Sequence, residues 1–335
     1  MDFFQAVVLG IVEGLTEYIP VSSTGHLILA KSFMGLTQKA LDPYLIVIQG
    51  GAILAVLGLY RTRVADMVKG LLGKSPTGLK LALNIIIAFL PAAIFGVMFD
   101  DAIDAWLMGP VPVVWALAIG GVIMIFAARW QKSAFQDSDN DSKRSFINIE
   151  HLTWKHALII GVIQCLAMFP GTSRSMVTIV AAMAIGMKPK HAAEFSFLLG
   201  LPTLGGATVY KLIKEGDALS TLSMGPMVVG IIVAFIFAAL AIKWLVAYLS
   251  KHGLALFGWY RIALAIAVIV GMNFGYFTDG NNSDNTSDGG ETTSSVVDPV
   301  TFNTDHCPAL PVATQTVPSK ITGPMADCQR PLIIS

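Results

Sequence analysis

Two glutamates lie four residues apart in an otherwise apolar N-terminal stretch, and a run of hydroxyl side chains with a histidine follows directly. The segment reads Glu13-Gly-Leu-Thr-Glu17-Tyr-Ile-Pro-Val-Ser22-Ser23-Thr24-Gly-His26. On a helix, side chains at i and i+4 share a face and lie about 6 Å apart. Two buried carboxylates that close do not both stay charged unaided, so one keeps its proton or a divalent cation lies between them. The pair suits Ca²⁺ or Mg²⁺, which prefer oxygen ligands, unless both carboxylates reach the membrane surface.

The hydroxyl residues after Pro20 are expected to open a new helix. Ser22, Ser23 and Thr24 would then lie at a helix N-terminus, where free N–H groups and the positive end of the dipole attract phosphate. One hydroxyl suffices for a cap, so three in a row indicate a further role. His26 lies one turn beyond the serines, and a serine near a histidine and a carboxylate is the arrangement of an activated nucleophile. The alternative for His26 alone is a histidine satisfied within the core.

A second segment far downstream repeats this plan. It reads Gln164-Cys-Leu-Ala-Met-Phe-Pro170-Gly-Thr172-Ser173-Arg174-Ser175. A basic residue inside an apolar segment is costly and marks a functional site, and a guanidinium captures phosphate oxygens with two hydrogen bonds. Arg174 could instead be a counter-ion for a glutamate of the first segment. Together, the two segments supply the inventory for phosphoryl transfer, which needs positioning and charge stabilisation.

Composition places both segments in a membrane protein. The 335 residues are 54% hydrophobic and 13% charged, against about a quarter charged in soluble domains. A net charge of zero excludes a strongly basic nucleic-acid binder, and the first residues, with Asp2 as their only charge, lack the features of a cleaved signal peptide. Six stretches are long and apolar enough to span a bilayer, near 41–60, 81–99, 111–130, 192–212, 226–246 and 257–277.

Two shorter segments, 3–31 and 156–187, are each interrupted by a proline, and such broken helices are tolerated at membrane depth only where they line a cavity or are buried. We therefore expect an all-α integral membrane protein with six full spans and two broken, re-entrant helix pairs. Most loop lysines and arginines gather on one side, which is the cytoplasmic side by the positive-inside rule. Both termini then lie outside, and residues 1–130 and 156–277 form an inverted-topology repeat whose broken segments meet near the midplane.

The chain beyond the single membrane domain 1–277 has a different character. Residues 278–335 are polar, low in complexity and interspersed with proline, so we expect a disordered tail outside the cytoplasm. Cys307 and Cys328 lie in this tail and could pair in an oxidising compartment, whereas Cys165 is expected to be a packed thiol. The oligomeric state stays open, a homo-oligomer included.

The two motif segments resemble the bacterial undecaprenyl-pyrophosphate phosphatase family of the bacitracin-resistance type. EGLTEYIPVSSTGHL at 13–27 is similar to its first signature and PGTSRS at 170–175 to its second, with further likeness at 48–56 and 192–203. The resemblance implies an enzyme of the bacterial inner membrane that removes the terminal phosphate of undecaprenyl pyrophosphate, leaving the carrier lipid used in peptidoglycan synthesis. It also implies dependence on a divalent cation and a site that opens on the extracytoplasmic side.

The residues that match the family motifs receive roles by this resemblance. Glu13 and Glu17 match the acidic pair, and Met176 stands where the family usually has glycine. We predict Ser23 as nucleophile, with His26 or Glu17 taking its proton; direct attack by water, or His26 as nucleophile, fits the same residues. The predicted substrate-binding residues are Ser22, Thr24, Thr172, Ser173, Arg174 and Ser175. The rival function is transport, as a lipid-phosphate flippase or an anion carrier, because inverted repeats with broken helices are also transporter architecture.

Overall fold

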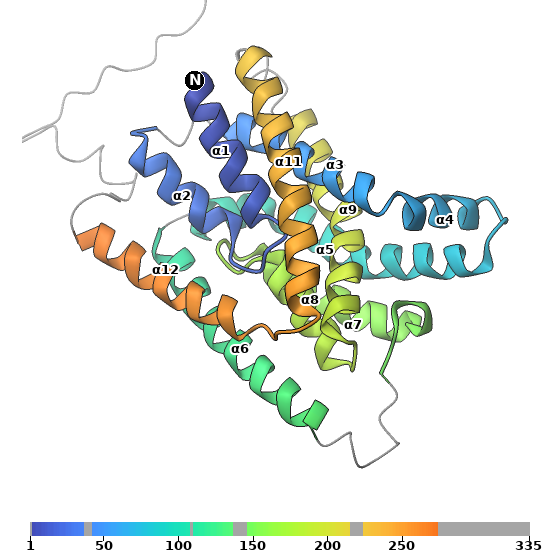
Figure 1. Cartoon of the computed structure of the whole chain (residues 1–335). Coiled ribbons are helices and arrows are strands. Elements are labelled where there is room, and N and C mark those ends of the chain that lie inside the picture. Colours follow the sequence, from blue (N-terminus) through green and yellow to red (C-terminus); the bar gives the residue numbers. More distant parts are fainter. Residues whose placement is uncertain (1, 37–41, 108–109, 137–145, 215–223, 274–335) are drawn as a thin grey trace, which may run out of the picture. The chain divides into compact units, whose positions relative to one another are not determined.

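The computed structural model describes residues 2–36, 42–107, 110–136, 146–214 and 224–273, all within one unit, Met1–Asn285 (Figure 1). These described residues are helical; they contain no strand, only an isolated bridge between Ile147 and Met187. In chain order the helices are α1 (Phe3–Thr16), α2 (Ser23–Phe33), α3 (Asp42–Leu59), α4 (Arg61–Leu71), α5 (Pro76–Leu107), α6 (Pro110–Gln136), η3 (Ile149–His151), α7 (Trp154–Gln164), η4 (Cys165–Met168), α8 (Arg174–Ala184), α9 (Pro189–Lys214), α11 (Met224–Leu249) and α12 (Ala255–Asn273).

Five of these helices are each long and apolar enough to cross a membrane, which confirms a multi-pass helical protein. They are Pro76–Phe99, Val111–Trp130, Pro189–Lys214, Met224–Leu249 and Ala255–Asn273, and each coincides with an expected span. Large apolar side chains stand exposed on their outer faces, such as Trp115, Phe126 and Ile232, as expected of helices that face lipid. The expected tail, 278–335 with Cys307 and Cys328, lies outside the described residues.

The expected span 41–60 corresponds to α3, which is followed at once by α4. The two helices meet at an angle of 82°, and they count as a sixth span only if taken together. Residues 61–80, which follow the expected span, contain α4 and the beginning of α5.

Both segments that the sequence predicts to be broken are broken. α1 ends at Thr16 and α2 begins at Ser23, while η4 ends at Met168 and α8 begins at Arg174. Each gap contains a proline, Pro20 or Pro170, which has no N–H to continue the helical ladder. The two breaks are thus built from the same local chemistry.

The helices of the first half pack against those of the second half in a reciprocal way. α1 packs along α11 and α7 along α5; α3 also contacts α11, and α9 also contacts α5. Other contacts between the two halves include those of α3 with α9 and of α6 with α12 (Figure 1). A Cβ on Gly14 would lie 2.5 Å from the carbonyl oxygen of Ala234, and one on Gly161 would lie 2.5 Å from that of Ala88. Glycine therefore permits both close approaches, and they hold the two broken pairs in place.

Candidate active site between the two helix breaks

The two helix breaks meet at a small polar cavity of about 150 Å³, called here the polar pocket. Its walls come from both breaks, with additions from α3, η4 and α9. The lining residues are Glu17, Ser22, Ser23, Thr24, Gln49, Ala167, Phe169, Pro170, Gly171, Ser173, Arg174 and Leu204. The pocket therefore brings together most of the side chains that the sequence selects, although the two groups lie in different halves of the chain.

Glu17 is the centre of this pocket. One oxygen, Oε2, accepts a hydrogen bond of 2.8 Å from Ser23 Oγ, and the other, Oε1, lies 3.3 Å from Nη2 of Arg174. The glutamate is only 7% exposed. A buried carboxylate is costly unless it is paired and hydrogen-bonded, and here both conditions hold. A serine hydroxyl thus points at a carboxylate that a cation holds in place, which is the geometry of a nucleophile with its base.

Arg174 is fixed from several sides. Nη1 donates to the carbonyl oxygen of Ser196 at 2.9 Å, and the guanidinium carbon lies 5.4 Å from the centre of the Tyr18 ring. α9 leaves room for it only because residue 200 is glycine, since a Cβ there would lie 2.8 Å from Nη1. Nε is buried and has no partner among the described residues. The ion pair with Glu17 is the counter-ion role that the sequence left open, and the guanidinium still has N–H groups for an anion.

The helices that follow the two breaks begin with the same unusual cap. Ser22 has φ 76° and Ser173 has φ 72°, and they are the only non-glycine residues with positive φ in the described ranges. Each serine Oγ accepts a bond of 3.4 Å from the backbone N–H three residues on, at Gly25 or Met176. Such backbone conformations cost about 1–3 kcal/mol and cluster at functional sites. They present two helix N-termini to the same pocket.

Two predicted residues of the second motif, Ser175 and Thr172, lie around the pocket rather than on its wall, and Met176 follows the motif. Ser175 is fully buried and donates from Oγ to the carbonyl oxygen of Ile19 at 3.3 Å, so it fastens one break to the other. Thr172 donates its backbone N–H to the carbonyl oxygen of Phe169 and forms the turn. Met176 is 3% exposed and belongs to the hydrophobic core, so the departure from the family's usual glycine affects packing.

His26 lies away from the Ser23–Glu17 pair. Its Nδ1 is 2.7 Å from the carbonyl oxygen of Ser22, and its Nε2 is 2.7 Å from the hydroxyl of Tyr260 on α12. Because a carbonyl only accepts, Nδ1 carries the proton and the neutral ring accepts at Nε2 from the tyrosine. The imidazole is thus engaged at both nitrogens and does not line the polar pocket. The geometry places Glu17, and not His26, next to the Ser23 hydroxyl.

Glu13 lies one turn before Glu17 and is 2% exposed. It does not line the polar pocket. No group of three or more histidine, cysteine, aspartate or glutamate side chains gathers anywhere in the described ranges. A divalent cation held by one or two carboxylates together with substrate phosphate oxygens is the usual arrangement for Mg²⁺. The glutamate pair offers oxygen donors only, which is the donor type that such an ion prefers, although only Glu17 of the two lines the pocket.

Two residues that complete the site were missed from the sequence. Gln49 on α3 lines the polar pocket, and its Oε1 accepts a bond of 3.2 Å from Thr208 Oγ1 on α9. Arg261 on α12 is fully buried and donates from Nη2 to the carbonyl oxygen of Gly171 at 2.8 Å. It thereby holds the turn that precedes Ser173. Arg261 could have been predicted from the sequence, because a charged residue inside the apolar span 257–277 marks a functional site. Gln49 could not, because an uncharged glutamine among apolar residues is a much weaker indication.

The fold and the site together define a multi-pass helical membrane protein with a polar pocket, lined by Glu17 and Arg174, between two helix breaks. The chain belongs to the family of bacitracin resistance protein BacA, whose model matches residues 6–267. An undecaprenyl-diphosphatase of Sorangium cellulosum is 46% identical over 271 residues, which are 80% of this chain and 86% of the relative. Undecaprenyl-diphosphatase 1 of Chromobacterium violaceum is 44% identical over 268 residues, 79% and 95% of the two chains. An undecaprenyl-diphosphatase of Pseudomonas putida is 40% identical over 279 residues, 82% and 97%.

Proposed function

We propose that this chain is an undecaprenyl-diphosphatase of the bacterial inner membrane. It hydrolyses undecaprenyl pyrophosphate to undecaprenyl phosphate and inorganic phosphate, and so returns the carrier lipid to peptidoglycan synthesis. The observation that carries this proposal is the Ser23–Glu17–Arg174 contact inside one pocket, because a carrier would not need a hydroxyl aligned with a base. The family and its curated relatives support the same activity.

In the proposed mechanism the two breaks bind the pyrophosphate and orient its terminal phosphorus toward Ser23. Arg174, the hydroxyls of Ser22, Thr24 and Ser173, and the two helix N-termini neutralise the phosphate oxygens. Glu17 takes the proton of Ser23 as Oγ attacks the terminal phosphorus. The bond from that phosphorus to the bridging oxygen breaks, and the lipid monophosphate leaves with its new oxygen charge stabilised by Arg174 and takes up the proton from Glu17. Water then attacks the phosphoserine and gives a proton to Glu17, the bond from phosphorus to Oγ breaks, and Glu17 returns this proton to Ser23 Oγ as phosphate is released.

A divalent cation, Ca²⁺ or Mg²⁺, is part of this proposal. When bound, it would supply charge neutralisation at the pyrophosphate oxygens, and Glu13 and Glu17 would hold it. Titration calorimetry without substrate tests this assignment. Glu13→Gln is expected to weaken cation binding tenfold or more, since even partners beyond the ligands cost 10–100-fold. Equal affinity in wild type and Glu13→Gln would contradict the assignment.

The arrangement in the membrane is also a proposal. The equivalent caps at Ser22 and Ser173 and the reciprocal packing of α1 on α11 and α7 on α5 support an inverted repeat, 1–130 and 156–277, with two re-entrant pairs. The lysines and arginines between the expected spans support termini on the extracytoplasmic side, and the resemblance to the family supports a pocket entrance on that side. Cysteine labelling of intact cells at residue 2 and at residue 74 tests the orientation: residue 2 is expected to react from outside and residue 74 is not.

Product analysis tests the proposed reaction. Purified protein given undecaprenyl pyrophosphate is expected to yield one inorganic phosphate for each undecaprenyl phosphate. Release of intact pyrophosphate with free undecaprenol would mean that a different bond is broken. The Glu17→Gln variant gives the background rate of phosphate release, because it keeps the shape of the side chain and removes the base.

Gln49 is predicted to donate a hydrogen bond to the phosphate. Thr208 binds its Oε1, so the amide N–H groups are the part left for an anion in the pocket. Gln49→Ala is expected to lower kcat/KM about tenfold, the lower end of a hydrogen bond to a charged group. Gln49→Glu is expected to lower it about 100-fold, because a carboxylate would then oppose the phosphate. Steady-state kinetics check this, and near-normal kcat/KM for Gln49→Glu would remove Gln49 from the site.

A further inference from the structure

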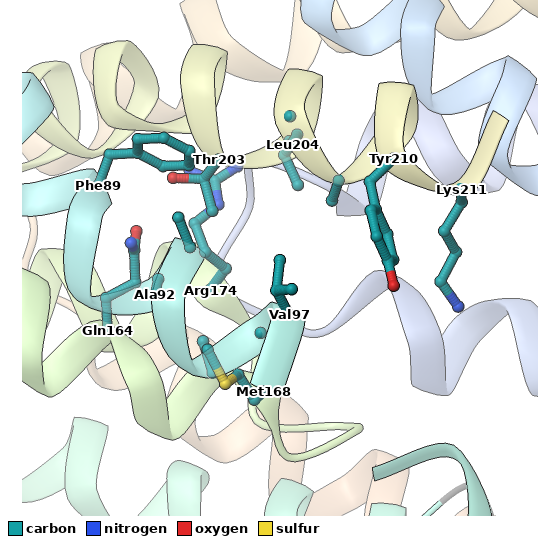
Figure 2. A pocket seen from close by; sticks show the side chains of 15 residues that line it. Phe89, Ala92, Val97, Gln164, Met168, Arg174, Thr203, Leu204, Tyr210 and Lys211 are labelled. Carbon is teal, nitrogen blue, oxygen red and sulfur yellow. The ribbon is translucent and has the colours of Figure 1, made fainter. Parts of the chain in front are cut away.

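A second, larger cavity lies directly beside the polar pocket. It measures about 350 Å³ and is enclosed by α5, α9 and the end of the α7–η4 segment (Figure 2). The two cavities have three lining residues in common, Ala167, Arg174 and Leu204. A ligand whose charged end occupied the polar pocket could therefore continue into this second space without leaving the protein. We call it the apolar cavity.

The walls of this cavity are chemically unlike those of the polar pocket. Phe89 and Val97 on α5, Met168 on η4 and Leu204 on α9 give it a mainly apolar surface. Its polar lining side chains include Arg174 and Gln164, and Tyr210 and Lys211 lie at the end away from Phe89 (Figure 2). Both long helices contain a proline next to a lining residue: Pro91 precedes Ala92, and Pro202 precedes Thr203. A proline removes a helical hydrogen bond and pushes the preceding turn aside. The two prolines therefore favour a gap between α5 and α9 at this position.

The outer end of the cavity opens on the lipid-facing side of the bundle. Val97 is 64% exposed and Tyr210 is 37% exposed, and both lie on helices whose exposed side chains are mostly large and apolar. Lys211 also lines the cavity beside Tyr210 (Figure 2), but the apolar surface around them does not favour entry of a water-soluble ligand. A molecule that already resides in the bilayer can enter sideways between α5 and α9.

We infer that the apolar cavity is a subsite for the first isoprenoid units of the substrate, next to the pyrophosphate. This inference rests on the proposed function and extends it to recognition of the lipid. Ligand pockets of roughly 300–1,000 Å³ hold molecules of drug size, so the cavity holds only the pyrophosphate end of the tail, and the remainder stays in the bilayer. Because the bilayer is itself apolar, entry of the tail gains little free energy, but it sets the direction from which the terminal phosphorus meets Ser23. A side chain that fills the cavity would exclude the tail and so weaken binding of a prenyl substrate.

Two adjacent glycines on α9 provide a matched pair of variants. Gly206 lines the cavity, and a Cβ there would meet only the Phe89 ring at 3.5 Å, whereas a Cβ on Gly205 would have nothing within 4 Å. Gly206→Leu therefore places a side chain inside the cavity, while Gly205→Leu places the same side chain on the same helix outside it. The two glycine-to-leucine variants change the helix propensity of α9 by the same amount, so a difference between them reflects the position of the new side chain. Val97→Phe fills the cavity from α5, and it provides the same test if the Gly206→Leu protein does not fold.

The test compares three compounds: undecaprenyl pyrophosphate, farnesyl pyrophosphate and, as a competitive inhibitor without a tail, inorganic pyrophosphate. Gly206→Leu and Val97→Phe are expected to raise KM for both prenyl substrates at least tenfold. The inhibition constant of inorganic pyrophosphate should stay within twofold, and Gly205→Leu should change neither quantity.

Several results would overturn the subsite. An inhibition constant that moves with KM would mean that the variants deform the polar pocket. Unchanged KM values would mean that no tail lies in the cavity. An effect on the long substrate alone would make the cavity an entrance for lipid rather than a seat for the first units. Wild-type protein that hydrolyses neither prenyl substrate would instead refute the proposed function, and the subsite with it.

Discussion

Ser23→Ala is expected to lower kcat at least about 1,000-fold, because removal of a nucleophile that acts with a base costs nearly the whole covalent route. Binding of the lipid pyrophosphate should remain, since Arg174 and the two helix N-termini stay in place. Single-turnover phosphate release and a separate binding measurement on the same purified protein check both parts. Ser250→Ala is the matched control, because Ser250 Oγ bonds only to the carbonyl oxygen of its own helix turn at Val246.

Two more variants decide whether Glu17 or His26 accepts the proton of Ser23. Glu17→Gln should lower kcat at least about 100-fold, within the range for general bases, because Ser23 Oγ donates directly to this carboxylate. His26→Asn should lower it less than tenfold, since both ring nitrogens are engaged elsewhere. Near-normal turnover of Ser23→Ala would show that Ser23 is not the nucleophile. A larger loss of kcat for His26→Asn than for Glu17→Gln would show that the histidine, and not the glutamate, accepts the proton.

Arg174→Lys is expected to lower kcat/KM about 1,000-fold, the lower end of what an arginine at a transferring phosphoryl group contributes. The guanidinium reaches the carbonyl oxygen of Ser196 with Nη1 and Glu17 with Nη2 at once. A lysine offers a single point of charge and cannot make both contacts while binding phosphate. Steady-state kinetics on undecaprenyl pyrophosphate give the value.

Two further variants control this result. Arg129→Lys makes the same exchange at an exposed position near the end of α6 and should leave kcat/KM unchanged. Gly200→Ala keeps the arginine but places a methyl group where Nη1 lies, so it should lower kcat/KM about tenfold through displacement of the guanidinium. If Arg174→Lys retained more than a tenth of wild-type kcat/KM, the arginine would be a structural counter-ion only.

The broken helices and Arg174 could be predicted from the sequence because both carry a large energetic cost in an apolar environment. A proline followed by several hydroxyls cannot continue a helix, and a lone arginine between apolar residues must be paired. Both free-energy costs arise from the residues themselves and their immediate neighbours in the chain, so they can be recognised from the sequence. The same reasoning identified Glu17 and Ser23, which the structure brings into contact.

Other features depend on residues that are distant in the chain. The direction of the His26 ring is set by Tyr260, which is 234 positions away, and the role of Gln49 arises only where α3 meets α9. The positive φ values at Ser22 and Ser173 are imposed by the tertiary fold, since no local preference of serine favours them.

Phosphate release from undecaprenyl pyrophosphate by the purified protein, measured first after chelation and then with Ca²⁺ or Mg²⁺ restored, tests the polar pocket most directly. We expect chelation to stop release and one of the two ions to restore it, with Ser23→Ala inactive under every condition. A folded wild-type protein that releases no phosphate with either ion would contradict the assignment of the polar pocket as a phosphatase site.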